Sequence, residues 1–185
     1  MTMTEKMRIV FTGAQGTGKT TLVNALAERG IRTISIAREQ ATETGWTSET
    51  PGSVEYQKEL YDKLYKAISS KKSYLSDRAL SCVAAYTFKH ALNNPEDASF
   101  KKLAESQYKK FCKFHNDNPD VLIVYTPIEF EIESDGLRNT NKEDQAQIDF
   151  LIKNILDTTG AEYLTVTGTV EERLAQIIAE LEKHA

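Results

Sequence analysis

The sequence contains few cysteines and no long apolar run. Its 185 residues include only 2 cysteines, Cys82 and Cys112, and neither has the C-x-x-C spacing of a metal site. A disulfide scaffold needs more cysteines, so we expect a reducing environment. No apolar run reaches the about 18 residues of a membrane span, and the opening MTMTEKM lacks the apolar core of a secretion signal. We therefore expect a cytoplasmic protein with no membrane partner.

Charge of one sign is not in large excess either. The 23 Lys and Arg residues against 27 Asp and Glu residues give a net charge of −4, which argues mildly against general attraction to nucleic acid. With 40% hydrophobic and 27% charged residues, the composition is typical of a globular protein with its own core. No repeat, low-complexity tract or linker divides the chain, so residues 1–185 are predicted to form a single domain.

Short apolar runs alternate with amphipathic segments along the chain. The runs, rich in Val, Ile and Tyr, are predicted strands, and they cover residues 8–12, 32–37, 73–76, 121–125 and 163–166. The segments with helical spacing cover residues 20–29, 54–70, 79–92, 96–114, 142–157 and 170–183. Because this alternation requires crossover connections, we predict a three-layer α/β fold with about five parallel strands and helices on both faces.

Several local signals predict where helices begin and where loops lie. Thr140 with Glu143, and Thr169 with Glu172, have the spacing of a capping box. Pro95 suits the first turn of a helix. The polar stretches 42–53 and 131–140 are predicted loops, placed where α/β proteins build their sites.

The stretch GAQGTGKTT, residues 13–21, lies between a predicted strand and a predicted helix. It meets the pattern G-x-x-x-x-G-K-[ST], in which a curled backbone directs its N–H groups at phosphate oxygens beside a helix N-terminus. Lys19 is expected to reach the outer phosphates, and the Thr20 hydroxyl to hold a magnesium ion. The expected nucleotide contacts are Gly13, Gln15, Gly16, Thr17, Gly18, Lys19, Thr20 and Thr21.

Two strings typical of guanine-nucleotide switch proteins also occur. They are NKED at residues 141–144 and DTTG at residues 157–160, which is the reverse of the order in those proteins. NKED begins a predicted helix, and the glycine of DTTG suits a helix C-terminus. We interpret both strings as coincidence, which favours a phosphotransferase over a switch.

Asp77 and Arg78 end an apolar run and precede a helix. Both side chains are therefore expected at the carboxyl edge of the sheet, near the phosphates. An aspartate there can orient magnesium or accept a proton from an attacking hydroxyl, and an arginine can bind a phosphate. The alternative is an aspartate that caps the following helix and pairs locally with the arginine.

The polar stretch SDGLRN, residues 134–139, is a candidate lid loop. Arg138 would lie over the nucleotide and stabilise the moving phosphoryl group, while closure of a lid excludes water. The alternative is a solvated turn in which Arg138 makes no contact.

Five segments together resemble a known family. They are residues 13–20 (GAQGTGKT), 36–40 (IAREQ), 73–86 (SYLSDRALSCVAAY), 125–138 (YTPIEFEIESDGLR) and 161–177 (AEYLTVTGTVEERLAQI). These segments resemble the P-loop kinase domain of bacterial ribosylnicotinamide kinases and related phage P-loop kinases. The likeness covers most of the chain, and its specific part is the phosphate loop.

The resemblance implies an ATP- and Mg2+-dependent kinase with a nucleoside-kinase-like sheet, acting in the cytoplasm, or in the host cytoplasm if phage-encoded. It places Asp77 at the acidic residue after the third strand, Arg138 at the lid arginine, and Arg38 at an arginine flanking the acceptor site. The relatives carry an acidic residue where this chain has Ile36. That departure leaves the identity of the acceptor open.

Three functions remain as alternatives. The first is transfer to a free nucleoside or nucleotide. The second is transfer to a hydroxymethylated base within DNA, an activity found among the phage relatives, because lysines cluster at residues 66–72 and 101–113. An ordinary solvated helix face explains the same lysines. The third is a regulatory P-loop NTPase without an acceptor. The sequence sets no oligomeric state.

Overall fold

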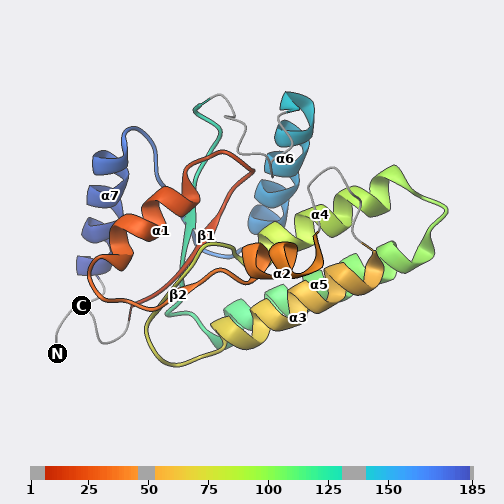
Figure 1. The fold of residues 1–185 in the computed structure, drawn as a ribbon, viewed down its shortest axis with the longest axis horizontal. Helices are drawn as coiled ribbons and strands as arrows, with labels where there is room; N and C mark the ends of the chain where they lie inside the picture. Colours follow the sequence, from red (N-terminus) through yellow and green to blue (C-terminus); the bar gives the residue numbers. More distant parts are fainter. Residues whose placement is uncertain (1–6, 46–52, 131–140, 184–185) are drawn as a thin grey trace.

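A parallel sheet forms the centre of the molecule (Figure 1). The structure is a computed structural model, and it describes residues 7–45, 53–130 and 141–183. The five strands lie in the order β2-β3-β1-β4-β5, and each neighbouring pair is parallel. Their bounds are β1 Arg8–Thr12, β2 Thr33–Ile34, β3 Tyr74–Ser76, β4 Leu122–Tyr125 and β5 Leu164–Thr165.

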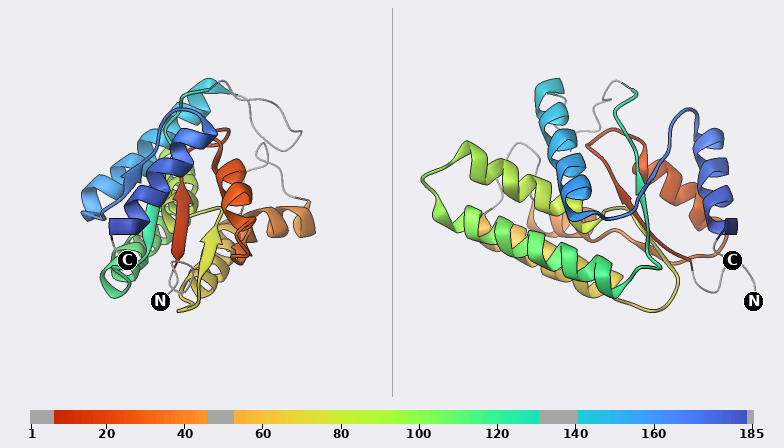
Figure 2. Two further views of the ribbon diagram at one scale, coloured as in Figure 1. Left: turned by 90° about the vertical axis from the view of Figure 1, so that its left-hand side faces the viewer. Right: turned by 180° about the vertical axis from the view of Figure 1, so that it is seen from behind.

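Helices lie on both sides of this sheet, as the two further views also show (Figure 2). In Figure 1, α1 and α7 are to the left of the strands, whereas α3, α4, α5 and α6 are to the right. The helix bounds are α1 Lys19–Ala27, α2 Ile36–Thr44, α3 Val54–Ile68, α4 Leu80–Asn93, α5 Ala98–Asp117, α6 Lys142–Thr159 and α7 Val170–Lys183. None of the described helices is long and apolar enough to cross a membrane.

The pleat of the central strands divides the core in two. Successive residues of a strand point to opposite faces of a sheet. In β1, Ile9 and Phe11 pack with α1 and α7, whereas Val10 packs with α3 to α6. In β4, Val124 joins the first cluster and Ile123 the second. The predicted three-layer fold with a parallel sheet covered on both faces is therefore confirmed.

The register of the sheet brings three strand ends to one edge. Val10 pairs with Ser76 of β3, and Thr12 pairs with Tyr125 of β4. The chain first builds β2 and β3 on one side of β1 and then β4 and β5 on the other. Ligand crevices of open α/β sheets form where the strand order reverses in this way, at the carboxyl ends of the strands. The phosphate loop follows β1 at this place.

One predicted strand and part of a predicted loop are wrong. Residues 32–37 contribute only Thr33–Ile34 to the sheet, and Ile36 already begins α2, which runs through the first residues of the predicted loop 42–53. The hydroxyls of Thr42 and Thr44 donate to the carbonyls of Arg38 and Gln40 one turn earlier. Such local bonds satisfy polar side chains inside a helix, so a polar composition did not exclude one. Trp46 and the rest of that loop up to residue 52 lie outside the described residues.

Helix starts agree with the predicted signals in some places and differ in others. At α7, the Thr169 amide donates to Glu172 at 2.7 Å and the Glu172 amide donates to the Thr169 hydroxyl at 3.3 Å, which is the predicted capping box. At α5 the cap is Asp97 rather than a turn around Pro95, because the Asp97 carboxylate accepts from the Ser99 amide. At α6 the cap is Asn141, and Thr140 lies outside the described residues.

Candidate active site

The loop after β1 has the backbone that a phosphate cradle requires. Gly13, Gly16 and Gly18 have φ angles of 144, 76 and 87°, a region that L side chains rarely adopt. A Cβ atom at Gly13 would lie 2.4 Å from the backbone oxygen of Thr126 and 2.5 Å from its hydroxyl. Gly13 therefore permits a close approach of β1 to the end of β4, and no other residue fits there.

Lys19 begins α1 and lies against this loop. Its side chain is 5% exposed, and its ammonium group donates to the carbonyl of Gly13 at 2.9 Å, to the Thr17 hydroxyl at 3.2 Å and to the Ala14 carbonyl. The lysine that the motif predicts to bind phosphate thus lies at the predicted loop, and its ammonium group contacts backbone carbonyls of that loop.

Hydrogen bonds of two threonine hydroxyls, those of Thr17 and Thr126, stabilise the shape of the loop. The Thr17 hydroxyl is 2.8 Å from that of Thr126 and donates to the Ala14 carbonyl at 3.0 Å. Thr17 is 1% exposed, so its hydroxyl is enclosed within the protein. Thr20 is half-buried in the first turn of α1, and Thr21 is exposed. Among Thr17, Thr20 and Thr21, only Thr20 both occupies the Ser/Thr position of the motif and is partly exposed.

Two helices hold the tip of the loop at Gln15. The Gln145 amide on α6 donates to the Gln15 carbonyl at 2.8 Å. The Tyr86 hydroxyl on α4 donates to the Gln15 side-chain oxygen at 3.1 Å. Gln15 is 6% exposed. The sequence offered no signal for Gln145, because a polar residue in an amphipathic helix is expected to face solvent.

Asp77 and Arg78 lie at the same edge of the sheet, directly after β3. Asp77 is 8% exposed, and its amide donates to the carbonyl of Ile34 at 3.1 Å. The cap residue of α4 is Ala79, with no side-chain bond to the helix. Asp77 is therefore not the cap residue of α4, but its charge does interact with that of Arg78, which is the local pairing that the alternative predicts.

Arg78 interacts with two tyrosines. It hydrogen-bonds Tyr86, whose pKa is raised by burial and lowered in part by the Arg78 charge. The pKa of Tyr56 on α3 is likewise raised by burial, and the same guanidinium opposes the shift. The Tyr56 carbonyl in turn accepts from the buried Gln40 side chain at 3.4 Å. Helices α2, α3 and α4 thus gather polar side chains next to Asp77.

Of the two remaining predicted site residues, the structure describes only Arg38. Arg38 is exposed on α2, and its role stays a prediction. Arg138 and the predicted lid loop 131–140 lie outside the described residues.

A half-buried carboxylate of α6 faces the phosphate loop and was not foreseen. Asp149 accepts from the Tyr125 hydroxyl at 2.8 Å. Burial raises the pKa of Asp149, and the Tyr125 hydrogen bond and the Lys19 charge oppose that rise. This carboxylate therefore adds negative potential behind the loop that carries Lys19. Nothing in its sequence neighbourhood distinguishes it from an exposed helix residue.

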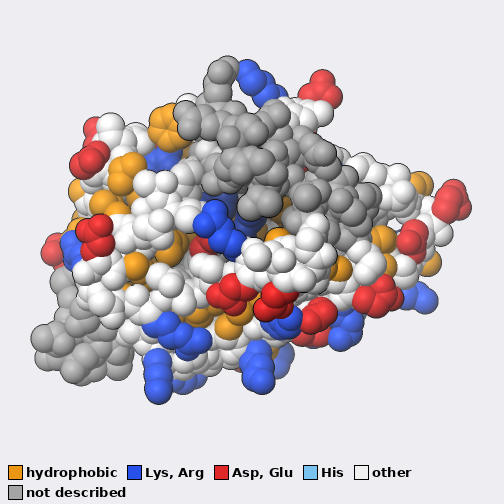
Figure 3. Space-filling view, viewed as in Figure 1, with side chains coloured by type: hydrophobic (Ala, Val, Ile, Leu, Met, Phe, Trp, Pro, Cys, Tyr) orange, Lys and Arg blue, Asp and Glu red, His pale blue; other side chains and the backbone are white. Residues whose placement is uncertain are grey.

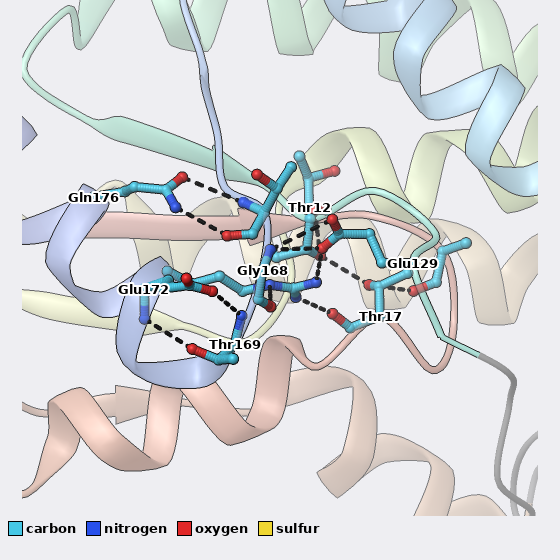
Figure 4. Close-up of polar contacts among 11 residues, drawn as sticks. Thr12, Thr17, Glu129, Gly168, Thr169, Glu172 and Gln176 are labelled. Atoms are coloured by element: carbon cyan, nitrogen blue, oxygen red, sulfur yellow. Dashed lines mark hydrogen bonds and ion pairs between the residues drawn. The ribbon is translucent and has the colours of Figure 1, made fainter.

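A second unforeseen residue, Arg173 of α7, joins three loops at the carboxyl edge of the sheet. Its guanidinium donates to the Gly168 carbonyl at 3.0 Å, to the Thr17 carbonyl at 2.8 Å and to the Glu129 carboxylate. Figure 4 shows Glu129, Gly168 and Thr17 converging on one point beside α7. The Phe130 ring lies 5.0 Å from the guanidinium carbon.

Comparison with known proteins agrees with this geometry. A family model described as an AAA domain matches residues 8–173. The chain belongs to this family. The matched range of this AAA domain runs from β1 through the phosphate loop to Arg173. Among curated protein sequences, none matches the chain.

Solved structures with the same fold include several kinases. A NadR protein in complex with NR has a TM-score of 0.66 at 17% identity over 95% of this chain. Thymidylate kinase from Candida albicans has a TM-score of 0.62 at 16% identity over 97% of this chain and 92% of its own. Deoxyadenosine kinase from M. mycoides has a TM-score of 0.59 at 12% identity over 97% of this chain and 100% of its own.

These similarities confirm the predicted resemblance to P-loop kinases at the level of the fold. The AAA domain spans about half of the NadR chains it matches, 50% and 52% of their length. Because the identities are low, the comparison concerns the arrangement of strands and helices.

Proposed function

We propose that this AAA domain transfers a phosphoryl group from ATP, with Mg2+, to a hydroxyl or phosphate of a nucleoside or nucleotide. The observation that carries the proposal is the phosphate loop at the end of β1. Gly13, Gly16 and Gly18 have the backbone that such a loop needs, and Lys19 is buried against it. Asp77 and Arg78 follow the neighbouring strand β3.

The residues present fit a magnesium-bound triphosphate. The backbone N–H groups of the loop and the Lys19 ammonium would bind the phosphates. Thr20 would hold the ion, and Asp77 would hold it through a bound water molecule. The described residues contain no group of three His, Cys, Asp or Glu side chains that could hold a metal by themselves. Magnesium bound to nucleotides uses one or two protein ligands together with phosphate oxygens and water, so a larger cluster is not needed.

Asp77 and Arg78 would act on the acceptor. The acceptor oxygen forms a bond to the γ-phosphorus while the bond to the ADP oxygen breaks, and the hydroxyl proton passes to the Asp77 carboxylate. Arg78 would bind an anionic group of the acceptor or of the transferred phosphoryl group. Tyr56 and Tyr86, which both interact with Arg78, offer rings against which a base can stack. Arg138 would stabilise the transferred group.

The structural neighbours support a nucleoside-type acceptor. They include a NadR protein in complex with NR, a thymidylate kinase and a deoxyadenosine kinase. A shikimate kinase from Acinetobacter baumannii, with a TM-score of 0.56 at 20% identity, shows that the fold also accommodates another acceptor. The aromatic side chains beside Arg78 favour a base-containing acceptor for this chain.

The lysines of α3 and α5 give little support to a DNA substrate. In the lysine-rich stretch 101–113, Lys110 pairs with Asp62 at 2.7 Å and Lys113 pairs with Asp117 at 2.7 Å. Figure 3 shows basic and acidic side chains mixed along the lower edge of the molecule. A surface that binds DNA phosphates needs a continuous positive stripe, and these pairs interrupt it.

The proposal is tested by acceptor-dependent ADP release. The purified protein is incubated with Mg·ATP and a panel of nucleosides, nucleotides and hydroxymethylated DNA, with Lys19→Ala as the inactive control. We expect release that depends on one nucleoside or nucleotide and is lost in the control. If only the modified DNA stimulates ADP release, the acceptor is a base in DNA and not a free nucleoside or nucleotide. If no acceptor stimulates ADP release, the protein is a regulatory NTPase and not a kinase.

A further inference from the structure

We propose that Arg173 is a positioning residue for the phosphate loop, acting through the carbonyl of Thr17. The inference rests on the proposed function, because it concerns how the same loop binds a nucleotide. Arg173 lies on α7, and the Thr17 carbonyl that it contacts belongs to a residue 156 positions earlier in the chain. No sequence motif or residue pattern predicts that Arg173 contacts Thr17.

The burial of Arg173 shows that its charge has a specific place. Its side chain is 2% exposed, and a buried guanidinium is stable only when its donors are paired. Three different nitrogens find three different acceptors: Nε the Gly168 carbonyl, Nη1 the Thr17 carbonyl and Nη2 the Glu129 carboxylate. The planar guanidinium spreads its five N–H donors over three nitrogens in a fixed fork, so it reaches acceptors that lie apart from one another, whereas a lysine has its three donors on one nitrogen.

The bond to Thr17 determines the direction of the next amide. The Thr17 carbonyl and the Gly18 N–H belong to one planar peptide unit, trans as in the rest of the described chain, so the two groups point in opposite directions. Helix α1 does not use the Thr17 carbonyl at its start, since the first backbone hydrogen bond of the helix runs from the Leu22 amide to the Gly18 carbonyl. Arg173 therefore holds the Thr17 carbonyl outward and directs the Gly18 N–H into the loop, where a phosphate oxygen can accept it.

The guanidinium also supports the loop directly. A Cβ atom added at Gly18 would lie 3.4 Å from Nη1 of Arg173, so this part of the loop packs on the arginine. On its other side, Glu129 binds the guanidinium and also accepts from the Gly168 amide at 3.1 Å. Phe130 covers the guanidinium with its ring. The contacts join the phosphate loop, the start of the β4–α6 connection and the β5–α7 loop (Figure 4).

The test compares Arg173→Lys with the wild type in ADP binding and in ATP kinetics. The lysine keeps the charge but loses at least two of the three bonds. We expect Mg·ADP affinity by calorimetry to fall about tenfold, as expected for the loss of a charge-assisted contact that orders a binding group. The KM for ATP should rise by a similar factor, whereas the KM for the acceptor stays within about twofold.

Two variants separate this effect from a general loss of stability. Arg8→Lys changes a 3% exposed arginine at the amino end of β1, whose guanidinium binds Asp120, Asn118 and the Ser70 carbonyl. Gln176→Ala removes a side chain of α7 that exchanges hydrogen bonds with the Thr167 backbone. Both should lower the unfolding temperature and leave Mg·ADP affinity within about twofold, because neither reaches the phosphate loop.

The outcomes are distinct. Wild-type affinity in folded Arg173→Lys, or an equal loss of affinity in Arg8→Lys, overturns the proposal. If Arg173→Lys does not fold, Glu129→Gln decides instead: it keeps the shape, removes the charge partner of Arg173, and should weaken Mg·ADP binding several-fold. Binding of ADP without transfer to any acceptor would refute the proposed function alone, since the calorimetric comparison needs no transfer. A wild type that binds no nucleotide overturns both.

Discussion

At the scale of single residues, Asp77 has two possible roles with different chemical signatures. A carboxylate that accepts a proton in the transition state is needed for the rate, whereas a carboxylate that caps a helix is needed for stability. Asp77 is 8% exposed and precedes Ala79, the cap residue of α4. Its position at the end of β3, beside the phosphate loop, favours the chemical role.

Replacing Asp77 with asparagine should therefore slow transfer and preserve nucleotide binding. We expect kcat to fall by a factor of about 100 to 10,000, the usual range for the loss of a general base, with Mg·ADP affinity changed only a few-fold. Asp97→Asn is the control, because Asp97 caps α5 and asparagine caps a helix equally well. Turnover of Asp77→Asn at the wild-type rate would assign Asp77 to structure.

A comparison of alanine substitutions at Gly13 and Gly30 distinguishes the cost of backbone strain from the cost of a steric clash. Both have positive φ angles, 144 and 79°, but a Cβ atom would meet Thr126 at 2.4 Å in the first case and nothing within 4 Å in the second. Gly30→Ala should cost about 1 kcal/mol of the free energy of unfolding, from φ strain alone. Gly13→Ala should cost about 3 kcal/mol or more, because the clash adds to the strain. Urea denaturation of both variants measures the difference, and equal losses would contradict the close approach.

At the scale of elements, short local signals determine where the helices begin, and tertiary contacts determine which distant residues the helix side chains bind. The capping box of Thr169 and Glu172 starts α7 at the end of the loop that carries Gly168. Arg173 follows one residue later in the same turn and reaches the phosphate loop. The start of α7 therefore determines whether its arginine can meet Thr17.

Removing this cap should lower stability by a modest amount. Thr169→Ala should reduce the free energy of unfolding by about 1 kcal/mol. A double-mutant cycle with Glu172→Ala should show coupling of about 0.5 kcal/mol or more, since the two residues exchange hydrogen bonds. Strictly additive losses would show that the two bonds form independently of each other.

At the scale of the whole molecule, a half-buried histidine packs against the core residues of α5. His115 lies near the end of α5, with its ring 4.4 Å from that of Phe111 and 5.5 Å from that of Phe114. Burial lowers the pKa of His115 to about 4. In the unfolded chain the same imidazole titrates near about 6.5. Between these values the unfolded state binds more protons than the folded state, so stability falls as the pH falls.

The resulting pH dependence is measurable by denaturation. From about pH 6.5 to pH 4, His115 should remove about 2–3 kcal/mol of the free energy of unfolding, and it should contribute no pH dependence above pH 7. His115→Gln should flatten the profile in that window, since glutamine does not titrate. His90, whose pKa burial also lowers, remains in both proteins and cancels in the comparison. Parallel profiles for the two proteins would show that His115 is solvated.

Features that depend on consecutive residues could be predicted from the sequence. The phosphate loop occupies nine residues, 13–21, and its glycines, lysine and flanking elements define its geometry locally. The alternation of apolar runs with helical segments determined the α/β fold for the same reason. Local pattern was insufficient for α2, because its polar residues bond within the helix, and for the start of α5, where Asp97 rather than Pro95 sets the boundary.

The tertiary structure alone decided which distant side chains meet the loop. Arg173 and Thr17 are 156 positions apart, Gln145 and Gln15 are 130 apart, and Tyr86 and Gln15 are 71 apart. A parallel sheet brings the carboxyl ends of strands together regardless of the chain length between them. Arginine, glutamine and aspartate on amphipathic helices look like solvent-exposed residues in the sequence. Only the packing of α4, α6 and α7 around β1 turns them inward, because a buried polar group is stable only where the fold supplies its partner.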